Sequence, residues 1–291
     1  HGKLPPGRPP AKGIRSCLLF MTPLFDAHNH LHDERLLHSL PELLPAMRDA
    51  RIEHCIVNGT CQDDWPRVMS LARRYPDLVQ PSLGLHPWKI ANRSPDWLEK
   101  LKRTLALHSG TVFLGECGLD RWIEDPHFED QREIFTLQLN LAAEHNLPLS
   151  IHCLKAWGPL MEILRSSKRP ARGFLLHSYG GSAELVPPLA SLGARFSFSG
   201  YFLQEHKEKI RAAFRQVPPD RLLVETDAPD MLPPDQHQGH LLCDREGQPL
   251  NHPANLPRIV NGLARVLGQA ESDLRVLLAD NFRRFFGLES S

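Results

Sequence analysis

Short apolar runs and longer amphipathic segments alternate along this chain from Met21 onward. A continuous apolar run bounded by polar turns is typical of a β-strand that is buried on both faces of a parallel sheet. We identify such runs at residues 23–25, 53–58, 79–84, 111–115, 147–151, 174–176, 195–199 and 221–226. The pattern therefore predicts eight strands, each followed by a helical segment.

The intervening segments have helical periodicity, with starts near residues 42, 65, 96, 128, 157, 183, 206 and 255, and a last helix from residue 272. Eight βα units predict an α/β protein with a closed (β/α)₈ barrel of the TIM type, in which residues 21–291 form one domain. Pro187 and Pro188 lie inside the helical segment that follows Ser182, so we expect that helix to be broken or kinked.

Two segments fall outside this alternation. Residues 1–20 are rich in Pro, Gly and basic side chains and have no periodicity, which indicates a disordered tail, an upstream extension or an expression remnant. Residues 228–254 are rich in proline and too long for an ordinary turn. On a barrel they form the loop after the eighth strand, and a long loop at that end is typical of a lid or binding surface.

Five of the predicted strands end on side chains that can bind metal ions, namely His28 with His30, then Glu116, His152, His177 and Asp227. The carboxyl ends of parallel strands meet at one edge of a barrel, where the active sites of such folds lie. A single histidine at a strand end is more often a core residue than a ligand. Several ionisable groups at one edge would, however, repel each other or remain unsatisfied without cations.

The spacing of these residues suggests a role for each. His28 and His30 are two residues apart on a strand, so their side chains leave the same face and can reach one cation. Glu116 offers two oxygens that can bridge two cations, and His152 and His177 can ligate the second. We expect Asp227 to complete the first site and to orient or deprotonate a water, so Glu116 and Asp227 are the predicted catalytic residues.

Two divalent cations are therefore the expected cofactors. Mixed imidazole and carboxylate ligation favours Zn, Mn, Co or Fe over Mg, which prefers oxygen ligands. Lys plus Arg and Asp plus Glu both number 34, so the chain has no general field that attracts a polyanion. Any nucleic-acid affinity must come from a local patch or from bound cations.

The cysteines and the hydropathy of the sequence indicate in which compartment the protein resides. The six cysteines are scattered and form no C-x-x-C pair, which is typical of reduced thiols in a cytoplasmic protein. No stretch approaches the roughly 18 apolar residues of a membrane span. We therefore expect no membrane association, and nothing in the sequence indicates an obligate protein partner.

Together the motifs resemble the TatD family of metal-dependent deoxyribonucleases in the amidohydrolase superfamily, over essentially everything after Met21. The landmarks are residues 26–30 (DAHNH), 84–87 (GLHP), 115–120 (GECGLD), 151–153 (IHC), 177–181 (HSYGG) and 225–229 (ETDAP). The resemblance implies a (β/α)₈ barrel and the same six metal ligands. It also implies hydrolysis of phosphodiester bonds in DNA, in several members from the 3′ end, and it leaves Mg open as the metal.

The chain departs from the family pattern where substrate contacts are expected. Family members commonly carry a second His at the position of Trp88, an Arg near Lys155, and a CFSG-like sequence at residues 178–181. His86 could donate to a substrate phosphate or stabilise the Pro87 turn. Lys155 could contact a phosphate or lie in solvent.

Six further residues are weaker substrate candidates. Gly180 and Gly181 could present backbone N–H groups to an anion or form a tight turn. Trp88, Trp122, Trp157 and Tyr201 lie in or near the loops after strands, where they could stack on a base or pack the lid.

Three functions are compatible with such a site. The leading prediction is a metal-dependent deoxyribonuclease, most simply an exonuclease, with DNA as its partner. The alternative is an amidohydrolase that acts on an amide, lactone or phosphotriester. Related barrels of that kind often bridge their metals with a modified lysine where Glu116 stands, which favours the nuclease. A third hypothesis is a metal-retaining scaffold without turnover, but such a protein has no need for both Glu116 and Asp227.

Overall fold

A computed structural model describes residues 22–288, and the predicted tail at residues 1–20 lies outside this range. Its main sheet has eight parallel strands in chain order. They are β1 (Leu24–Asn29), β2 (Ile52–Asn58), β3 (Val79–Leu83), β4 (Phe113–Asp120), β5 (Leu149–Leu154), β6 (Phe174–Leu176), β7 (Ala194–Ser199) and β8 (Leu222–Glu225). All eight predicted strands are present, and the α/β barrel class is confirmed.

The first and last strands close the barrel at their carboxyl ends. The backbone N–H of Asp227 donates to the carbonyl of His28 at 3.0 Å, and that of His30 donates to Ala228 at 2.8 Å. Buried Asp26 accepts from the backbone N–H of Thr226 at 2.9 Å and from its hydroxyl at 2.5 Å. These bonds hold the residues that follow β8 against β1, which places Asp227 beside His28 and His30.

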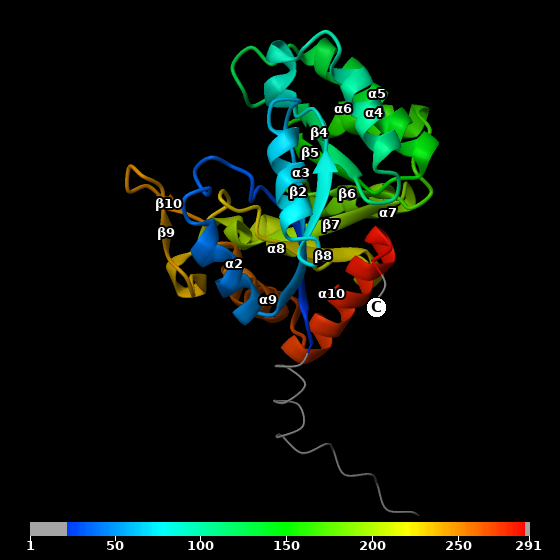
Figure 1. Cartoon of the computed structure of the whole chain (residues 1–291). Coiled ribbons are helices and arrows are strands. Elements are labelled where there is room, and N and C mark those ends of the chain that lie inside the picture. The colour runs from blue at the N-terminus through cyan, green and yellow to red at the C-terminus, as the bar shows by residue number, and fades with distance from the viewer. Residues whose placement is uncertain (1–21, 289–291) are drawn as a thin grey trace, which may run out of the picture.

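Helices follow the strands and cover the barrel (Figure 1). The α-helices are α2 (Leu40–Asp49), α3 (Trp65–Arg74), α4 (Trp97–Leu107), α5 (Phe128–His145), α6 (Trp157–Ser166), α7 (Val186–Ser191), α8 (Glu208–Phe214), α9 (Leu256–Leu267) and α10 (Glu271–Phe286). Each begins within a few residues of its predicted start. None of the helices within residues 22–288 is long and apolar enough to span a bilayer.

Several 3₁₀ turns complete the loops: η1 (Pro87–Asn92), η2 (Ala183–Leu185), η3 (Gly200–Leu203), η4 (Glu205–Lys207), η5 (Pro219–Arg221), η6 (Asp235–His237) and η7 (Pro253–Asn255). The predicted break at Pro187 and Pro188 is confirmed, because η2 ends there and the short helix α7 starts with its prolines in the first turn. Proline is tolerated in a first turn, where its missing N–H breaks no helical bond.

The amino-terminal end of the barrel is filled by aromatic side chains. Phe282 of α10 stacks on Phe25 of β1 with ring centroids 4.7 Å apart, and Phe286 stacks on Phe113 of β4 at 5.4 Å. Because β1 and β4 lie on different sides of the barrel, α10 closes this opening. Figure 1 shows α10 in red beside the start of β1 in blue.

The long loop after β8 is ordered by side chains that bind its backbone. Asn251 donates to the carbonyl of Thr226 at 2.7 Å, and Asn255 accepts from the backbone N–H groups of Gly239 and His240, both at 2.8 Å. The loop also contains a small hairpin of β9 (Leu242–Cys243) and β10 (Pro249–Leu250). Buried amides satisfy the loop backbone, so it is a fixed wall of the barrel mouth.

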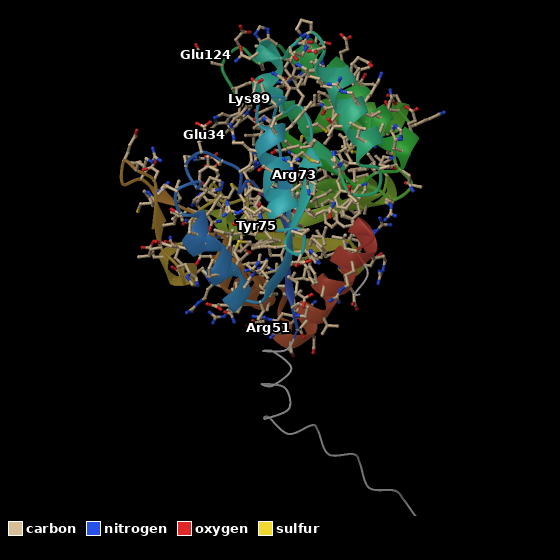
Figure 2. All side chains as sticks on the ribbon, in the orientation of Figure 1. Glu34, Arg51, Arg73, Tyr75, Lys89 and Glu124 are labelled. Carbon is tan, nitrogen blue, oxygen red and sulfur yellow. The ribbon has the colours of Figure 1, made fainter. Side chains whose placement is uncertain are left out.

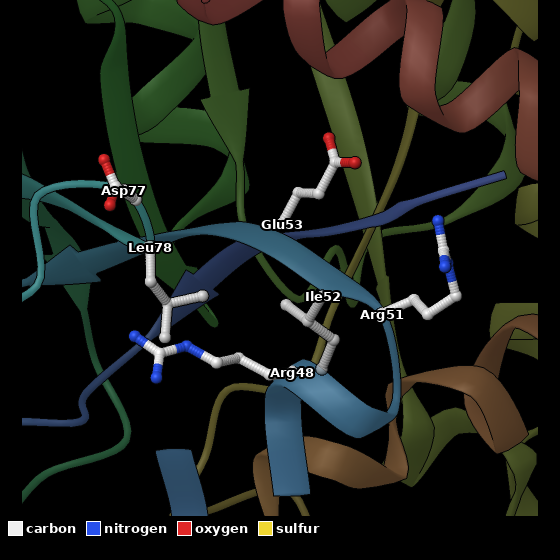
Figure 3. A pocket seen from close by; sticks show the side chains of 6 residues that line it. All are labelled: Arg48, Arg51, Ile52, Glu53, Asp77 and Leu78. Carbon is white, nitrogen blue, oxygen red and sulfur yellow. The ribbon is translucent and has the colours of Figure 1, made fainter. Parts of the chain in front are cut away.

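The two ends of the barrel differ in their surface. In Figure 2, Lys89 and Glu124, from the loops after β3 and β4, lie at the end opposite Arg51, which precedes β2. A surface pocket near Arg51, lined also by Arg48, Glu53 and Asp77, lies at this amino-terminal end (Figure 3). It is therefore distant from the carboxyl ends of the strands, where the predicted ligands lie.

Candidate metal centre

The structure brings all six predicted ligands together around Glu116, which is 2% exposed. On one side, Glu116 Oε2 lies 3.4 Å from His28 Nε2 and 3.3 Å from His30 Nε2. Asp227 Oδ1 lies 3.6 Å and 3.5 Å from the same two nitrogens, which are 3.2 Å apart. Four donor atoms therefore surround one point.

A second group of donors surrounds the other oxygen of the same carboxylate. Glu116 Oε1 lies 2.8 Å from His177 Nε2 and 3.2 Å from His152 Nδ1, and those nitrogens are 3.3 Å apart. His86 Nε2 lies 3.1 Å from the same oxygen. Glu116 thus stands between two separate sets of imidazoles.

The spacing of the donor atoms fits metal ions. Zinc bonds nitrogen and oxygen at 2.0–2.2 Å, so adjacent ligand atoms of a tetrahedral site lie about 3.3–3.6 Å apart. The separations of 3.2–3.6 Å around Glu116 Oε2 match this value. The set of neutral imidazoles and carboxylates suits Zn and other transition metals, as the sequence predicted.

Irregularities in two strands turn the ligands inward. Phe25 and Ala27 of β1 belong to the apolar cluster at the amino-terminal end, so strict alternation would turn His28 outward. The register between β1 and β2 shifts between Asp26 and Asn29, which reverses the alternation and brings His28 into the barrel.

A shift of register also turns Glu116 of β4 inward. Phe113 belongs to the inner apolar cluster, and the register with β5 shifts between Leu114 and Cys117. Gly115 lies at this shift with φ +132°, and a Cβ there would lie 2.8 Å from atoms of Ser150. Only glycine fits this close approach, which leaves Glu116 directed at the histidines.

The second ring nitrogen of each ligand histidine faces a hydrogen-bond acceptor. His28 Nδ1 lies 2.8 Å from Ser150 Oγ, and His30 Nδ1 lies 2.7 Å from the carbonyl of Asn58. His152 Nε2 lies 2.9 Å from Asp120 Oδ2. Such partners keep the proton on the outer nitrogen and leave the inner nitrogen free to ligate a metal.

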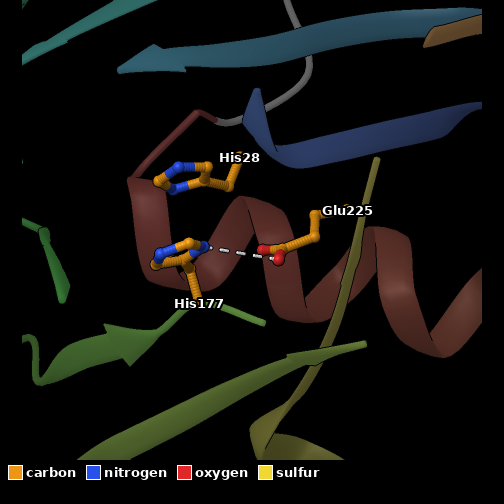
Figure 4. A group of neighbouring side chains, drawn as sticks. All are labelled: His28, His177 and Glu225. Atoms are coloured by element: carbon orange, nitrogen blue, oxygen red, sulfur yellow. Dashed lines mark ion pairs between the residues drawn. The ribbon is translucent and has the colours of Figure 1, made fainter. Parts of the chain in front are cut away.

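Glu225 faces His177 as an ion-pair partner, with its Oε1 3.6 Å from His177 Nδ1, which is too long for a hydrogen bond (Figure 4). Figure 4 also shows the ring of His177 stacked on that of His28, with centroids 3.9 Å apart. Glu225 is fully buried and accepts from the backbone N–H of Ser178 at 2.7 Å and from the hydroxyl of Ser197. These bonds engage both carboxylate oxygens and fix the side chain of Glu225, so its negative charge is held beside His177 and orients the ring.

Sequence reasoning missed these supporting residues. Asp120, Ser150 and Glu225 lie on strands that also carry a predicted ligand or precede one directly. Asp120 and Glu225 lie within residues 115–120 and 225–229, where the sequence predicts only Glu116 and Asp227 as ligands. A charged residue inside an apolar run was the available signal, since a buried carboxylate needs a partner.

His86 differs from the other histidines. Its Nδ1 accepts a hydrogen bond from the backbone N–H of Trp88 at 3.1 Å, so a neutral ring carries its proton on Nε2. That Nε2–H points at Glu116 and is a donor, whereas a metal ligand would need a free lone pair there. Burial lowers the pKa of His86 to about 4, which favours this neutral form. The turn interpretation is supported, because His86 caps η1, whereas donation to a substrate phosphate stays a prediction.

Without cations, protons balance the charge of the carboxylates. Burial alone would lower the pKa of His30, but hydrogen bonds to Asp227 and Glu116 raise it well above its usual value. The pKa of His177 is likewise raised well above normal, against its burial, by Glu116 and Glu225. Burial would raise the pKa of Glu116, yet His86 and His177 hold it well below normal. Bound cations can replace this positive charge.

The remaining predicted substrate contacts lie at the rim. Lys155 is exposed, and its Nζ lies 3.8 Å from the ring centroid of Trp122. Gly180 and Gly181 precede η2, a turn of three residues, so they do not open a long helix. A Cβ on Gly181 would lie 2.5 Å from the Tyr179 hydroxyl, which favours the tight-turn interpretation. Their contact with an anion stays a prediction without structural support.

Comparison with known proteins is consistent with this geometry. The family model described as TatD related DNase matches residues 25–287. The 3′-5′ ssDNA/RNA exonuclease TatD of Erwinia tasmaniensis is 31% identical over 268 residues, which cover 91% of this chain and 100% of that protein. The uncharacterized metal-dependent hydrolase YcfH of Escherichia coli K12 is 33% identical over 271 residues, covering 92% and 97%.

Solved structures show the same fold. The crystal structure of YJJV, a TatD homolog from Escherichia coli K12, superposes with a TM-score of 0.83 at 28% identity and covers 91% of this chain and 98% of that one. The lactonase Lmo2620 from Listeria monocytogenes has a TM-score of 0.58 at 13% identity, with 94% and 97% covered. This more distant likeness concerns the barrel alone.

Proposed function

The chain belongs to the family of TatD related DNases, and on that basis we propose that it is an exonuclease that hydrolyses phosphodiester bonds of single-stranded DNA from the 3′ end. One observation carries the proposal: the two oxygens of Glu116 each face a separate set of histidines. A bridging carboxylate between two cation sites is the arrangement used for in-line displacement at phosphate. The match to a nuclease family favours this function over a small-molecule amidohydrolase.

Two divalent cations would be held by the six ligands, four donors on the Asp227 side and three on the His152 side, with Glu116 shared. Such cations lower the pKa of a coordinated water and neutralise charge that develops on a phosphate. Three protein donors on the His152 side would leave a position for water or substrate, whereas the four donors on the Asp227 side would do so only with a fifth ligand.

The residues of the chain supply the remaining steps. Asp227, only 8% exposed, orients the attacking water and accepts its proton. His86 donates its Nε2 proton in a hydrogen bond to a phosphate oxygen, which it can reach because it borders the same carboxylate as His152 and His177. Lys155 provides a positive charge at the rim that attracts the next phosphate.

One experiment tests the proposal and separates it from its alternatives. The purified protein is incubated with end-labelled single-stranded DNA, duplex DNA and single-stranded RNA, with added metal or with chelator, beside a lactone and amide panel. We expect a chelator-sensitive ladder that shortens single-stranded DNA from its 3′ end, and Asp227→Asn should slow it by about 10²- to 10⁴-fold under metal saturation.

Other results would change the conclusion. Turnover of the small molecules alone would overturn the nuclease, and equal or preferred cleavage of RNA would overturn the specificity for DNA. An unchanged rate for Asp227→Asn would remove Asp227 as the base.

A cytoplasmic location is part of the proposal. The cysteines Cys55, Cys61, Cys117, Cys153 and Cys243 of the described residues are all free thiols. Free thiols, several of them buried, are typical of a reducing compartment.

A further inference from the structure

Two tryptophans beside the metal centre are largely exposed to solvent. Trp88 is 55% exposed and Trp122 is 63% exposed. They follow β3 and β4 directly, so both lie on the loops around the barrel mouth. Trp157, in contrast, packs its ring on that of Tyr179 at 5.0 Å. A large apolar ring exposed beside a polar site points to a contact with a ligand.

The indole of Trp88 is held by Asp120, the carboxylate that faces His152. Its indole Nε1–H donates to Asp120 Oδ2 at 2.7 Å, and the same oxygen lies 2.9 Å from His152 Nε2. The ring centroid of Trp88 lies 5.1 Å from that of His86 and 6.1 Å from that of His152. The indole is therefore held next to the position that a scissile phosphate would occupy.

The geometry of the bond leaves the indole available. Nε1 lies at the edge of the ring, so the hydrogen bond to Asp120 sets the orientation of the ring plane without covering its faces. A tryptophan whose purpose was only to pack would be buried. Here 55% of the residue remains exposed, and the fixed ring leaves little ordering for a ligand to impose.

The side chain of Lys155 adds a positive charge beside these tryptophans. Trp122 is tied to the same carboxylate, because its backbone N–H donates to Asp120 Oδ1 at 2.6 Å. Lys155 Nζ then lies 3.8 Å from the ring centroid of Trp122. Aromatic faces beside a positive charge are the combination with which proteins bind unpaired nucleotides, since the rings stack on bases and the cation pairs with the backbone.

We propose that Trp88 is the stacking platform for the base of a nucleotide that adjoins the scissile phosphate. The inference rests on the proposed nuclease function and deepens it. Base stacking on an indole needs a base that is free of its complementary strand. Trp88 thereby favours single strands at the step of substrate binding, with the Trp122 and Lys155 pair beside it for the adjoining backbone.

The test compares two variants on two kinds of substrate. Trp88→Ala removes the ring, whereas Trp88→Phe keeps an aromatic face and loses the N–H that binds Asp120. Each is assayed on a short single-stranded oligonucleotide and on versions with an abasic residue at either nucleotide that flanks the scissile phosphate. Leu107→Ala, which truncates a 73% exposed side chain at the end of α4, is the control.

We expect Trp88→Ala to lose roughly 5- to 150-fold in kcat/KM on the normal oligonucleotide, mainly through KM, the range found for base stacking on an aromatic residue. On one abasic substrate the wild type and Trp88→Ala should become equal, and Trp88→Phe should keep most of the preference for a base. Anisotropy of a labelled phosphorothioate oligonucleotide should show the same order in Kd.

Two outcomes would overturn the inference, and they differ from each other. An equal loss for Trp88→Ala on normal and abasic substrates, matched by Trp88→Phe and confined to kcat, would mean that Trp88 only positions Asp120 and His152. No cleavage of any oligonucleotide by the wild type with added metal would overturn the nuclease itself, and the platform with it.

Discussion

The two ends of this barrel are built on opposite physical principles. At the amino-terminal end, Phe25, Phe113, Phe282 and Phe286 fill the interior with stacked rings. At the carboxyl end, the same strands bury imidazoles and carboxylates around Glu116. Burial of apolar rings stabilises the fold directly, at about 1.5–3 kcal/mol for a phenylalanine. Burial of ionisable groups costs free energy unless partners or cations compensate for it.

The difference teaches how one fold separates stability from chemistry. The apolar end can hold the strands together whether or not metal is bound, because its packed phenylalanine rings carry no charge and bind no cation. The polar end depends on its internal pairs, on protons or on cations. Variants at the two ends should therefore affect different measurements, and three of them can be ordered by expected effect, followed by a test of pH dependence.

The largest effect is expected for Glu116→Gln. The amide keeps the shape but removes the negative charge between the two sets of histidines, so the second cation should be lost. We expect hydrolysis to fall by at least about 10³-fold and metal content to fall below two ions per chain. Oligonucleotide cleavage and elemental analysis measure these changes. Glu133→Gln on the exposed face of α5 is the control, and wild-type activity in Glu116→Gln would refute the bridging role.

At the other end, Phe282→Ala should reduce stability without an effect on chemistry. Phe282 is 1% exposed, stacks on Phe25 and packs at a tilt on Phe286, so its truncation leaves a cavity. We expect a loss of about 3–5 kcal/mol in the free energy of unfolding, measured by urea denaturation. The activity per folded molecule should stay unchanged. A specific loss of activity in a fully folded variant would contradict the separation of the two ends.

Substitution of His86 tests whether this residue binds the substrate or a metal ion. If His86 is a donor, His86→Ala should lower kcat/KM by roughly 10- to 100-fold, the value of a hydrogen bond to a charged group. Both cations should remain bound, and His86→Gln should restore part of the rate because its amide can donate. A fall in metal content to one ion per chain would instead make His86 a ligand.

The mildest intervention is a change of pH, because it alters no side chain. His30, His152 and His177 have raised pKa values in the absence of cations, so they hold protons at and above the usual range for histidine. Metals bind the neutral ring, so each bound ion must displace protons, and affinity should increase with pH. We expect about tenfold per pH unit for each proton displaced, between about pH 6 and pH 8. Calorimetry in two buffers of different ionisation enthalpy counts these protons, and an affinity independent of pH would contradict the expectation.

Much of the fold could be predicted from local chemistry. The eight apolar runs are strands because residues buried on both faces of a parallel sheet must be apolar along their whole length. The six ligands could be predicted for the same reason. A polar side chain at the end of such a run lies at the catalytic edge of the barrel, as His152 and His177 do.

Other features depend on local backbone geometry or on residues that are distant in the sequence. The distinction between His86 and the ligand histidines required the backbone of Trp88, and the support of His152 and His177 required Asp120 and Glu225. The packing of Trp157 on Tyr179 and the exposure of Trp88 could not be distinguished in advance. Both are aromatic residues in or near loops, and only packing separates them.

The sequence by itself determined the order of the strands, the barrel and the set of candidate ligands, because hydrophobic periodicity and side-chain chemistry are local properties. The tertiary structure decided which way each ligand points. Strict alternation from Phe25 and Phe113 turns His28 and Glu116 away from the interior. The shifts of register between β1 and β2, and between β4 and β5, reverse this direction. Such shifts arise from the pairing of neighbouring strands, which no single segment encodes.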